Sequence, residues 1–200
     1  MPLSFSGELA AYVKKALGAG RQVHFTPPYP HDNMIFLSEL LDIPPGNLKG
    51  KASVPLIMAI VAQRSHKSAE EVAEMEKAVN ISGAMHVAVM KAAAPGKKES
   101  ELAGIAQGIA TALGNGTAYN IILSVNGQIL HNHHHGNILR SGQLLLGDHG
   151  AASAMHYAGD LTRTCPVDNT FTDRQRDIYQ IVLDAEVSAI ESLRPGPTYL

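Results

Sequence analysis

Three stretches of the chain carry apolar side chains every three or four positions, the spacing of amphipathic helices. They are residues 68–93, 99–113 and 172–192. Ser68 with Glu71 and Thr172 with Gln175 have the spacing of a capping box, in which two residues exchange side-chain and backbone hydrogen bonds at a helix start. The pattern therefore predicts three helices, two of them with capped N-termini.

Shorter apolar runs predict strands. Residues 120–125 and 144–148 are rich in Ile, Leu and Val and are followed closely by turn residues. Asn126-Gly127 is a favoured two-residue hairpin turn, so 128–131 is expected to return as a strand that carries His131. A further strand is expected within 155–164.

The first 53 residues have the pattern of a piece of α/β structure. Helical spacing over 9–17 and 33–41 predicts two helices, and the apolar positions of 22–25 predict a strand between them. Prolines follow both the strand and the second helix and would end them.

Two acidic residues, Asp148 and Asp160, fall in the strand region near the end of the chain. If the chain folds back about Ala154, Asp148 pairs with Asp160 and the two carboxylates lie side by side. Adjacent carboxylates need a shared proton, an Arg or a metal ion, and hard oxygen ligands suit a divalent cation. Arg163 lies three positions from Asp160 and so points to the other face. Two solvated Gly-Asp turns remain the alternative.

The motifs around these residues resemble a known family. They are Asp148-His149-Gly150-Ala151, Tyr157 to Thr164, Pro166-Val167, and Phe171-Thr172 with Gln175. They are similar to the metallopeptidases that include Xaa-Pro aminopeptidase, prolidase and methionine aminopeptidase. The resemblance implies an α+β fold called the pita-bread fold, with 54–200 as its first half and 1–53 as the end of an N-terminal α/β domain or linker. Pro-Gly pairs at 95–96 and 195–196 fit a repeat of two such halves.

The resemblance also implies a site. Asp148 and Asp160 would be ligands of two divalent metal ions, Mn or alternatively Co or Zn. His131, 17 positions before Asp148, would contact the substrate near the scissile carbonyl. The family's remaining ligands, a His and two Glu, have no match after Asp160. We therefore expect an incomplete Xaa-Pro aminopeptidase, inactive alone, whose complete form cleaves proline-containing peptides.

Three other interpretations stay open. The chain would be a non-catalytic binding module of the same fold, a prolidase that acts on Xaa-Pro dipeptides, or a metal-independent hydrolase resembling creatinase. Retention of both Asp148 and Asp160 argues against the last and, less strongly, against the non-catalytic module. Three consecutive histidines, His133 to His135, can bind metal where a loop lets them converge, but they alternate faces in a strand.

Composition narrows the possible partners and location. A net charge of −2 gives no indication of a nucleic-acid or membrane surface. The longest apolar stretch, 54–62, is too short to span a bilayer. Cys165 is the single cysteine, which together with the absence of a signal-peptide pattern predicts a cytoplasmic protein. The uncovered half-fold predicts a homo-oligomer or a complementary C-terminal half.

Overall fold

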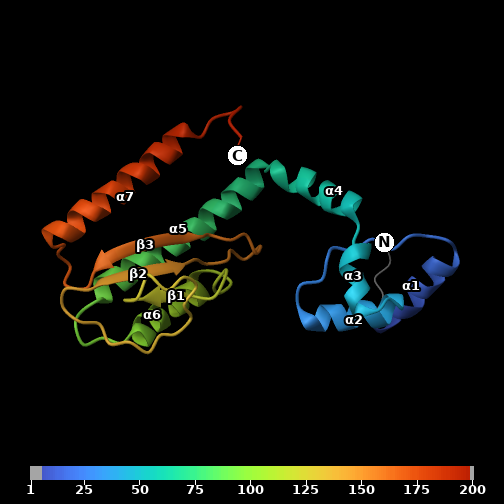
Figure 1. The fold of residues 1–200 in the computed structure, drawn as a ribbon, viewed down its shortest axis with the longest axis horizontal. Coiled ribbons are helices and arrows are strands. Elements are labelled where there is room, and N and C mark those ends of the chain that lie inside the picture. The colour runs from blue at the N-terminus through green and yellow to red at the C-terminus, as the bar shows by residue number, and fades with distance from the viewer. Residues whose placement is uncertain (1–5, 199–200) are drawn as a thin grey trace. The chain divides into compact units, whose positions relative to one another are not determined.

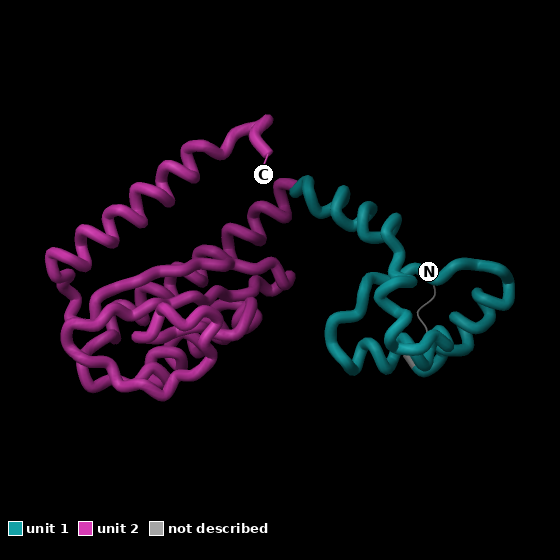
Figure 2. The backbone as a smooth tube through the Cα atoms, viewed as in Figure 1, with its two compact units in different colours: residues 1–67 teal, residues 68–200 magenta. Residues whose placement is uncertain are grey.

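The computed structural model describes residues 6–198, which form two compact units, 1–67 and 68–200 (Figure 2). The first unit contains η1 (Ser6–Glu8), α1 (Leu9–Gly18), α2 (His31–Leu41), α3 (Pro45–Lys51) and α4 (Val54–Ser65). The second contains α5 (Ala69–Ala92), α6 (Glu99–Leu113), β1 (Ile122–Ser124), β2 (Leu144–His149), β3 (Leu161–Pro166) and α7 (Asp173–Ser192). The two units divide after Lys67, and the domain boundary after residue 53 stays a prediction.

The described part of the first unit is helical. Helices α1 and α2 confirm the two expected near 9–17 and 33–41. The strand expected at 22–25 is wrong, because no strand is assigned between residues 6 and 67. A short apolar run needs a partner strand to satisfy its backbone groups, and residues 6–67 supply none. None of the helices in the described chain is both long and apolar enough to cross a membrane.

The second unit is built on a three-stranded antiparallel sheet in the order β1-β2-β3, with α5 and α6 packed against it (Figure 1). Side chains alternate faces along β2, where Leu145 and His149 are buried and Leu144 and Asp148 are partly exposed. Leu145 joins an apolar core with residues of both helices, so Asp148 lies on the sheet face away from that core.

The hairpin expected around Asn126-Gly127 is wrong. A local turn does form there, with the Ile129 amide donating to the Asn126 carbonyl at 3.0 Å. However, β1 pairs with β2, with Ile122 opposite Asp148, and the segment after the turn is not a strand. His131 lies in that segment, exposed and with a φ of 53°.

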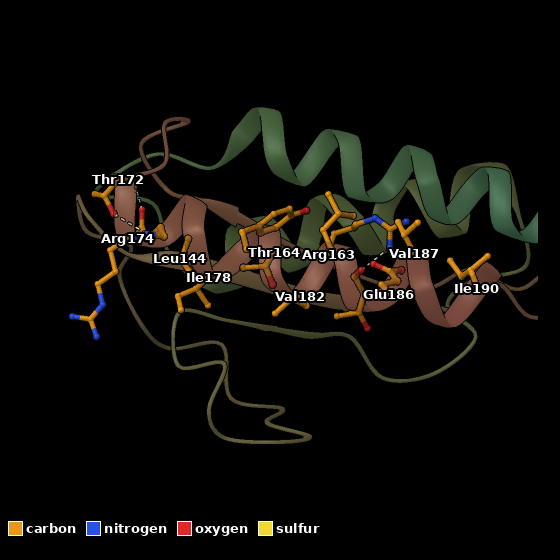
Figure 3. A pocket seen from close by; sticks show the side chains of 14 residues that line it. Leu144, Arg163, Thr164, Thr172, Arg174, Ile178, Val182, Glu186, Val187 and Ile190 are labelled. Carbon is orange, nitrogen blue, oxygen red and sulfur yellow. Dashed lines mark hydrogen bonds between the residues drawn. The ribbon is translucent and has the colours of Figure 1, made fainter. Parts of the chain in front are cut away.

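The three helices of the second unit confirm the sequence pattern. Both capping boxes, Ser68 with Glu71 and Thr172 with Gln175, are formed. Helix α7 differs from α5 and α6 because none of its residues is buried. A groove of about 930 Å³ lies between α7 and the sheet, lined by apolar residues such as Ile178, Val182 and Ile190 (Figure 3).

Candidate metal centre

A tyrosine hydroxyl joins the two aspartates. The Oη atom of Tyr119 lies 2.8 Å from Oδ1 of Asp148 and 2.7 Å from Oδ1 of Asp160. Asp148 is the fifth residue of β2, and Asp160 is exposed just before β3. The two carboxylates therefore share one side of the sheet and lie within reach of one small ligand.

The register of β2 and β3 differs from the expected one. Asp148 lies opposite Thr162, not opposite Asp160. The turn is centred on Met155 and not on Ala154, because the Ser153 amide donates to the Tyr157 carbonyl at 2.8 Å across three turn residues. Asp160, two positions before Thr162, still projects to the face of Asp148 as its diagonal neighbour. The direct pairing was wrong, and the shared face is as expected.

Tyr119 is the site residue that sequence reasoning missed. Burial raises the pKa of its hydroxyl above the ordinary value, and the hydrogen bonds to Asp160 and Asp148 raise it further. The hydroxyl therefore stays protonated and donates its single hydrogen between two acceptors. Its position ahead of the strand at 122–124 was visible, but a contact across 29 and 41 positions leaves no local pattern.

His131 was expected near the same cleft. Within the described chain, none of the hydrogen bonds joins His131 to Asp148 or Asp160. Its neighbour His135 contacts the Ile121 carbonyl through Nε2 at 3.1 Å. His133 and His135 line a small pocket of about 370 Å³ beside α6.

Behind the sheet, two buried histidine rings stack at 3.8 Å between centroids. Burial, with a smaller contribution from the adjacent His86, lowers the pKa of His149 to about 3. Burial also lowers the pKa of His86. Both rings are therefore neutral near pH 7, and the ring nitrogens of His149 have no hydrogen-bond partner among the residues described. His149 faces the core, so it is no ligand on the Asp148 side of the sheet.

The donor set fits a hard divalent cation in kind but not in number. Two carboxylates on one face supply the oxygen ligands that Mg²⁺, Mn²⁺ and related ions prefer. Between residues 6 and 198, no group of three or more His, Cys, Asp or Glu side chains converges on one point. A tightly held ion takes more ligands than these two carboxylates.

The comparisons with known proteins define the class to which this fold and acidic pair belong. A sequence profile described as metallopeptidase family M24 matches residues 73–199. The chain belongs to this family.

The individual relatives indicate a narrower class of protein than the family does. The Xaa-Pro aminopeptidase of Escherichia coli is 37% identical over 140 residues, and that of Haemophilus influenzae is 38% identical over 133 residues. The two alignments cover 68% and 65% of this chain but only 32% and 31% of the relatives. The chain thus spans about a third of the length of these enzymes.

Solved structures agree. Zn-substituted E. coli aminopeptidase P in complex with product matches with a TM-score of 0.62 and 38% identity, covering 65% of this chain and 30% of that one. A variant of the same enzyme in complex with substrate matches with a TM-score of 0.75 and 28% identity, covering 93% and 45%. The expectation of an α+β pita-bread fold is confirmed.

Proposed function

We propose that this polypeptide supplies one half of the active site of an Xaa-Pro aminopeptidase, which hydrolyses the bond between an N-terminal residue and proline. The observation that carries the proposal is the pair Asp148 and Asp160, held on one sheet face by Tyr119 at 2.8 and 2.7 Å. Membership of family M24 and the Xaa-Pro aminopeptidase relatives support it.

Each residue has a role in this proposal. Asp148 and Asp160 would be two of the ligands that hold two divalent ions, Mn²⁺ or alternatively Co²⁺ or Zn²⁺. When bound, the ions supply Lewis acidity and a water of lowered pKa. Tyr119 orients both carboxylates through its hydroxyl, as hydrogen-bonded groups around metal ligands commonly do. His131 contacts the substrate carbonyl and stabilises the negative charge that develops on its oxygen.

The substrate class follows from the chemistry of proline. An X-Pro bond has no amide hydrogen, so peptidases that hydrogen-bond this donor handle it poorly, and a dedicated enzyme has a distinct role. Peptides with proline in second position are the proposed substrates, with Xaa-Pro dipeptides as the alternative. A cytoplasmic location fits the single Cys165, which forms no disulfide.

The missing ligands define the proposed partner. The chain matches 30% and 45% of the two aminopeptidase P structures, so the rest of the fold lies in polypeptide outside the matched region. That polypeptide, a C-terminal half or a second copy of this chain, would bring the remaining His and Glu ligands to Asp148 and Asp160.

The test uses the full-length protein, meaning this chain together with the polypeptide that completes the fold. The substrate is an Xaa-Pro peptide, and Mn²⁺ is added. Asp148→Asn and Asp160→Asn should each lower the turnover rate more than about a hundredfold, because loss of a direct ligand exceeds the cost of losing an outer partner. Asp168→Asn removes the same charge from an exposed turn residue and should leave activity unchanged. His131→Ala should lower kcat while metal content stays constant.

Two outcomes would contradict the proposal. Metal binding without turnover of any Xaa-Pro peptide would identify a non-catalytic module of the same fold. Turnover that survives chelation and both Asp substitutions would identify a metal-independent hydrolase.

A further inference from the structure

A row of three small or polar side chains on α5 faces the strands that carry the aspartates. Ala78, Ser82 and His86 are spaced by four, so they lie on one face of the helix, and each is at most 4% exposed. We refer to these three residues as the α5 ridge. Helix α5 contacts both β2 and β3; His86 bonds to the backbone of both strands, and Ser82 bonds to the backbone of Ala151, two residues beyond β2.

His86 joins the two strands at the residues next to the aspartates. Its Nε2 lies 3.1 Å from the carbonyl oxygen of His149 and 2.9 Å from that of Leu161. Both partners are acceptors, so Nε2 carries the hydrogen and donates to both. His149 follows Asp148 directly, and Leu161 follows Asp160 directly. One side chain therefore fixes the backbone beside both carboxylates.

Ser82 makes the second attachment, one helical turn away. Its hydroxyl donates to the Ala78 carbonyl at 2.8 Å and accepts from the Ala151 amide at 2.9 Å. The Ala151 carbonyl in turn accepts from the Gly159 amide at 2.9 Å. A Cβ at Gly159 would lie 2.4 Å from Ser82 Oγ, so the backbone of the returning chain rests directly on the ridge.

We infer that His86 and Ser82 are positioning residues for the metal centre, which set the separation of Asp148 and Asp160 by holding the backbone of both strands from behind the sheet. The inference rests on the proposed function, since it concerns the same two ligands. A metal site requires its ligands within about 0.5 Å of the productive geometry, and Asp160 is exposed outside the ends of β3. The ridge supplies the support that the strand pairing alone does not give this residue.

The alternative to a positioning role is that the ring of His86 only fills space in the core. An apolar ring would then serve as well, whereas the positioning role needs an N–H donor at this place. The two roles are separated by His86→Phe, which keeps a ring against His149 and loses the donor, and by His86→Gln, which keeps a donor and loses the ring.

The experiment measures the Mn²⁺ dissociation constant of the full-length protein by electron paramagnetic resonance of free Mn²⁺. We expect His86→Phe to raise it about tenfold or more, as for outer partners of metal ligands, and His86→Gln to stay within about threefold of wild type. Ser82→Ala, which leaves the Ala151 amide without its acceptor, should raise it about threefold. Excess Mn²⁺ should restore most of the activity of His86→Phe.

Val89→Ala is the matched control, since Val89 is 3% exposed in the core on the same helix and bonds to neither strand through its side chain. It should lower Tm without changing Mn²⁺ affinity. Wild-type affinity in His86→Phe, or an equal loss in His86→Gln or Val89→Ala, overturns the inference. Should His86→Phe fail to fold, an unchanged dissociation constant in Ser82→Ala overturns it. A wild-type protein that binds no divalent ion overturns the proposed function itself and the inference with it.

Discussion

Gly159, next to a proposed metal ligand, shows how closely the chain passes α5. Added at this position, a Cβ would lie 2.6 Å from the Ala78 carbonyl oxygen, which is backbone and cannot turn aside. Overpacking of this kind costs about 1–3 kcal/mol. We therefore expect Gly159→Ala to lower the free energy of unfolding by about 2–3 kcal/mol in a urea titration.

Gly104 is the control for this substitution. It is exposed in α6, and an added Cβ meets nothing within 4 Å. Gly104→Ala should raise stability by up to about 1 kcal/mol, because Ala is the better helix former. Equal effects of the two substitutions would show that the backbone at Gly159 does not pack closely against α5.

The buried His86 predicts how stability depends on pH. Burial lowers its pKa; the His149 and Leu161 carbonyls and Asp148 oppose this shift, and Arg163 adds to it. The unfolded chain therefore binds a proton more readily than the native one. The contribution of His86 is fully present above about pH 6.5 and is lost as the pH falls through the lowered native pKa.

The measurement is the free energy of unfolding of the full-length protein between pH 7 and 5. We expect it to fall with pH in wild type and to fall less steeply in His86→Gln, which has no ring to protonate. His149 is present in both proteins, and burial, the larger cause of its lowered pKa, does not depend on the charge of His86. Parallel curves would mean that His86 takes up its proton equally well in the native state.

Glu99 joins three elements and is the clearest case of a residue whose role the sequence concealed. Its carboxylate is fully buried and accepts from Ser124 Oγ, the Val125 amide, and the Asn137 amide and side chain, all at 2.9–3.1 Å. Glu at a helix start is normally solvated and favoured by the helix dipole. Here it connects α6 to the end of β1 and to the loop that follows His131.

Glu99→Ala should lower the free energy of unfolding by about 3–5 kcal/mol, because it leaves several buried donors without an acceptor. Hydrogen exchange should show the greatest loss of protection in residues 124–137. Glu101→Ala, at an exposed position two residues on, is the control and should change stability by less than about 0.5 kcal/mol. An unchanged exchange pattern in Glu99→Ala would contradict this role.

The elements that could be predicted from the sequence are those whose signals are local. Helix α6 has the bounds read from its apolar spacing, and Ser68 and Thr172 mark the starts of α5 and α7. The hairpin at Asn126 failed because its first strand is engaged elsewhere. Val125 donates its amide to Glu99, and β1 pairs with β2. The local turn was right, and distant polar contacts decided the pairing.

The candidate metal centre also combines features that have a local sequence signal with features that have none. The shared face of Asp148 and Asp160 follows from strand alternation, which is local. Their offset in register depends on the Ser153 turn, in which a Ser hydroxyl accepts from two amides, and short-range propensity does not reveal it. Tyr119 and His86 reach the site across 29 to 75 positions, and one sequence contains no signal for such contacts.

At the scale of the whole molecule, helix α7 exposes a row of apolar side chains. Its apolar side chains Ile178, Val182 and Ile190 are 57–62% exposed and line the groove in Figure 3. Contiguous apolar patches of more than a few hundred Å² are rare on monomeric proteins. We expect the isolated 200-residue polypeptide to self-associate in light scattering, because its relatives carry further polypeptide and this chain alone leaves the groove open.

The matched variant replaces Val182 and Ile190 with Glu. Charges within the groove should shift the polypeptide toward monomer while helix content by circular dichroism stays the same. A monodisperse wild-type monomer that melts cooperatively would show that the fold needs no second half.

The α5 ridge also sets the order in which the protein assembles during synthesis. His86 emerges from the ribosome before the carbonyl groups that it binds, 63 and 75 positions later. At roughly 5–20 residues per second, the interval to Leu161 is about 4–15 s. Until then, the side chain of His86 lacks the two carbonyl groups that it binds in the folded chain. The two aspartates therefore reach their native separation only when the chain is long enough for β3 to close on α5.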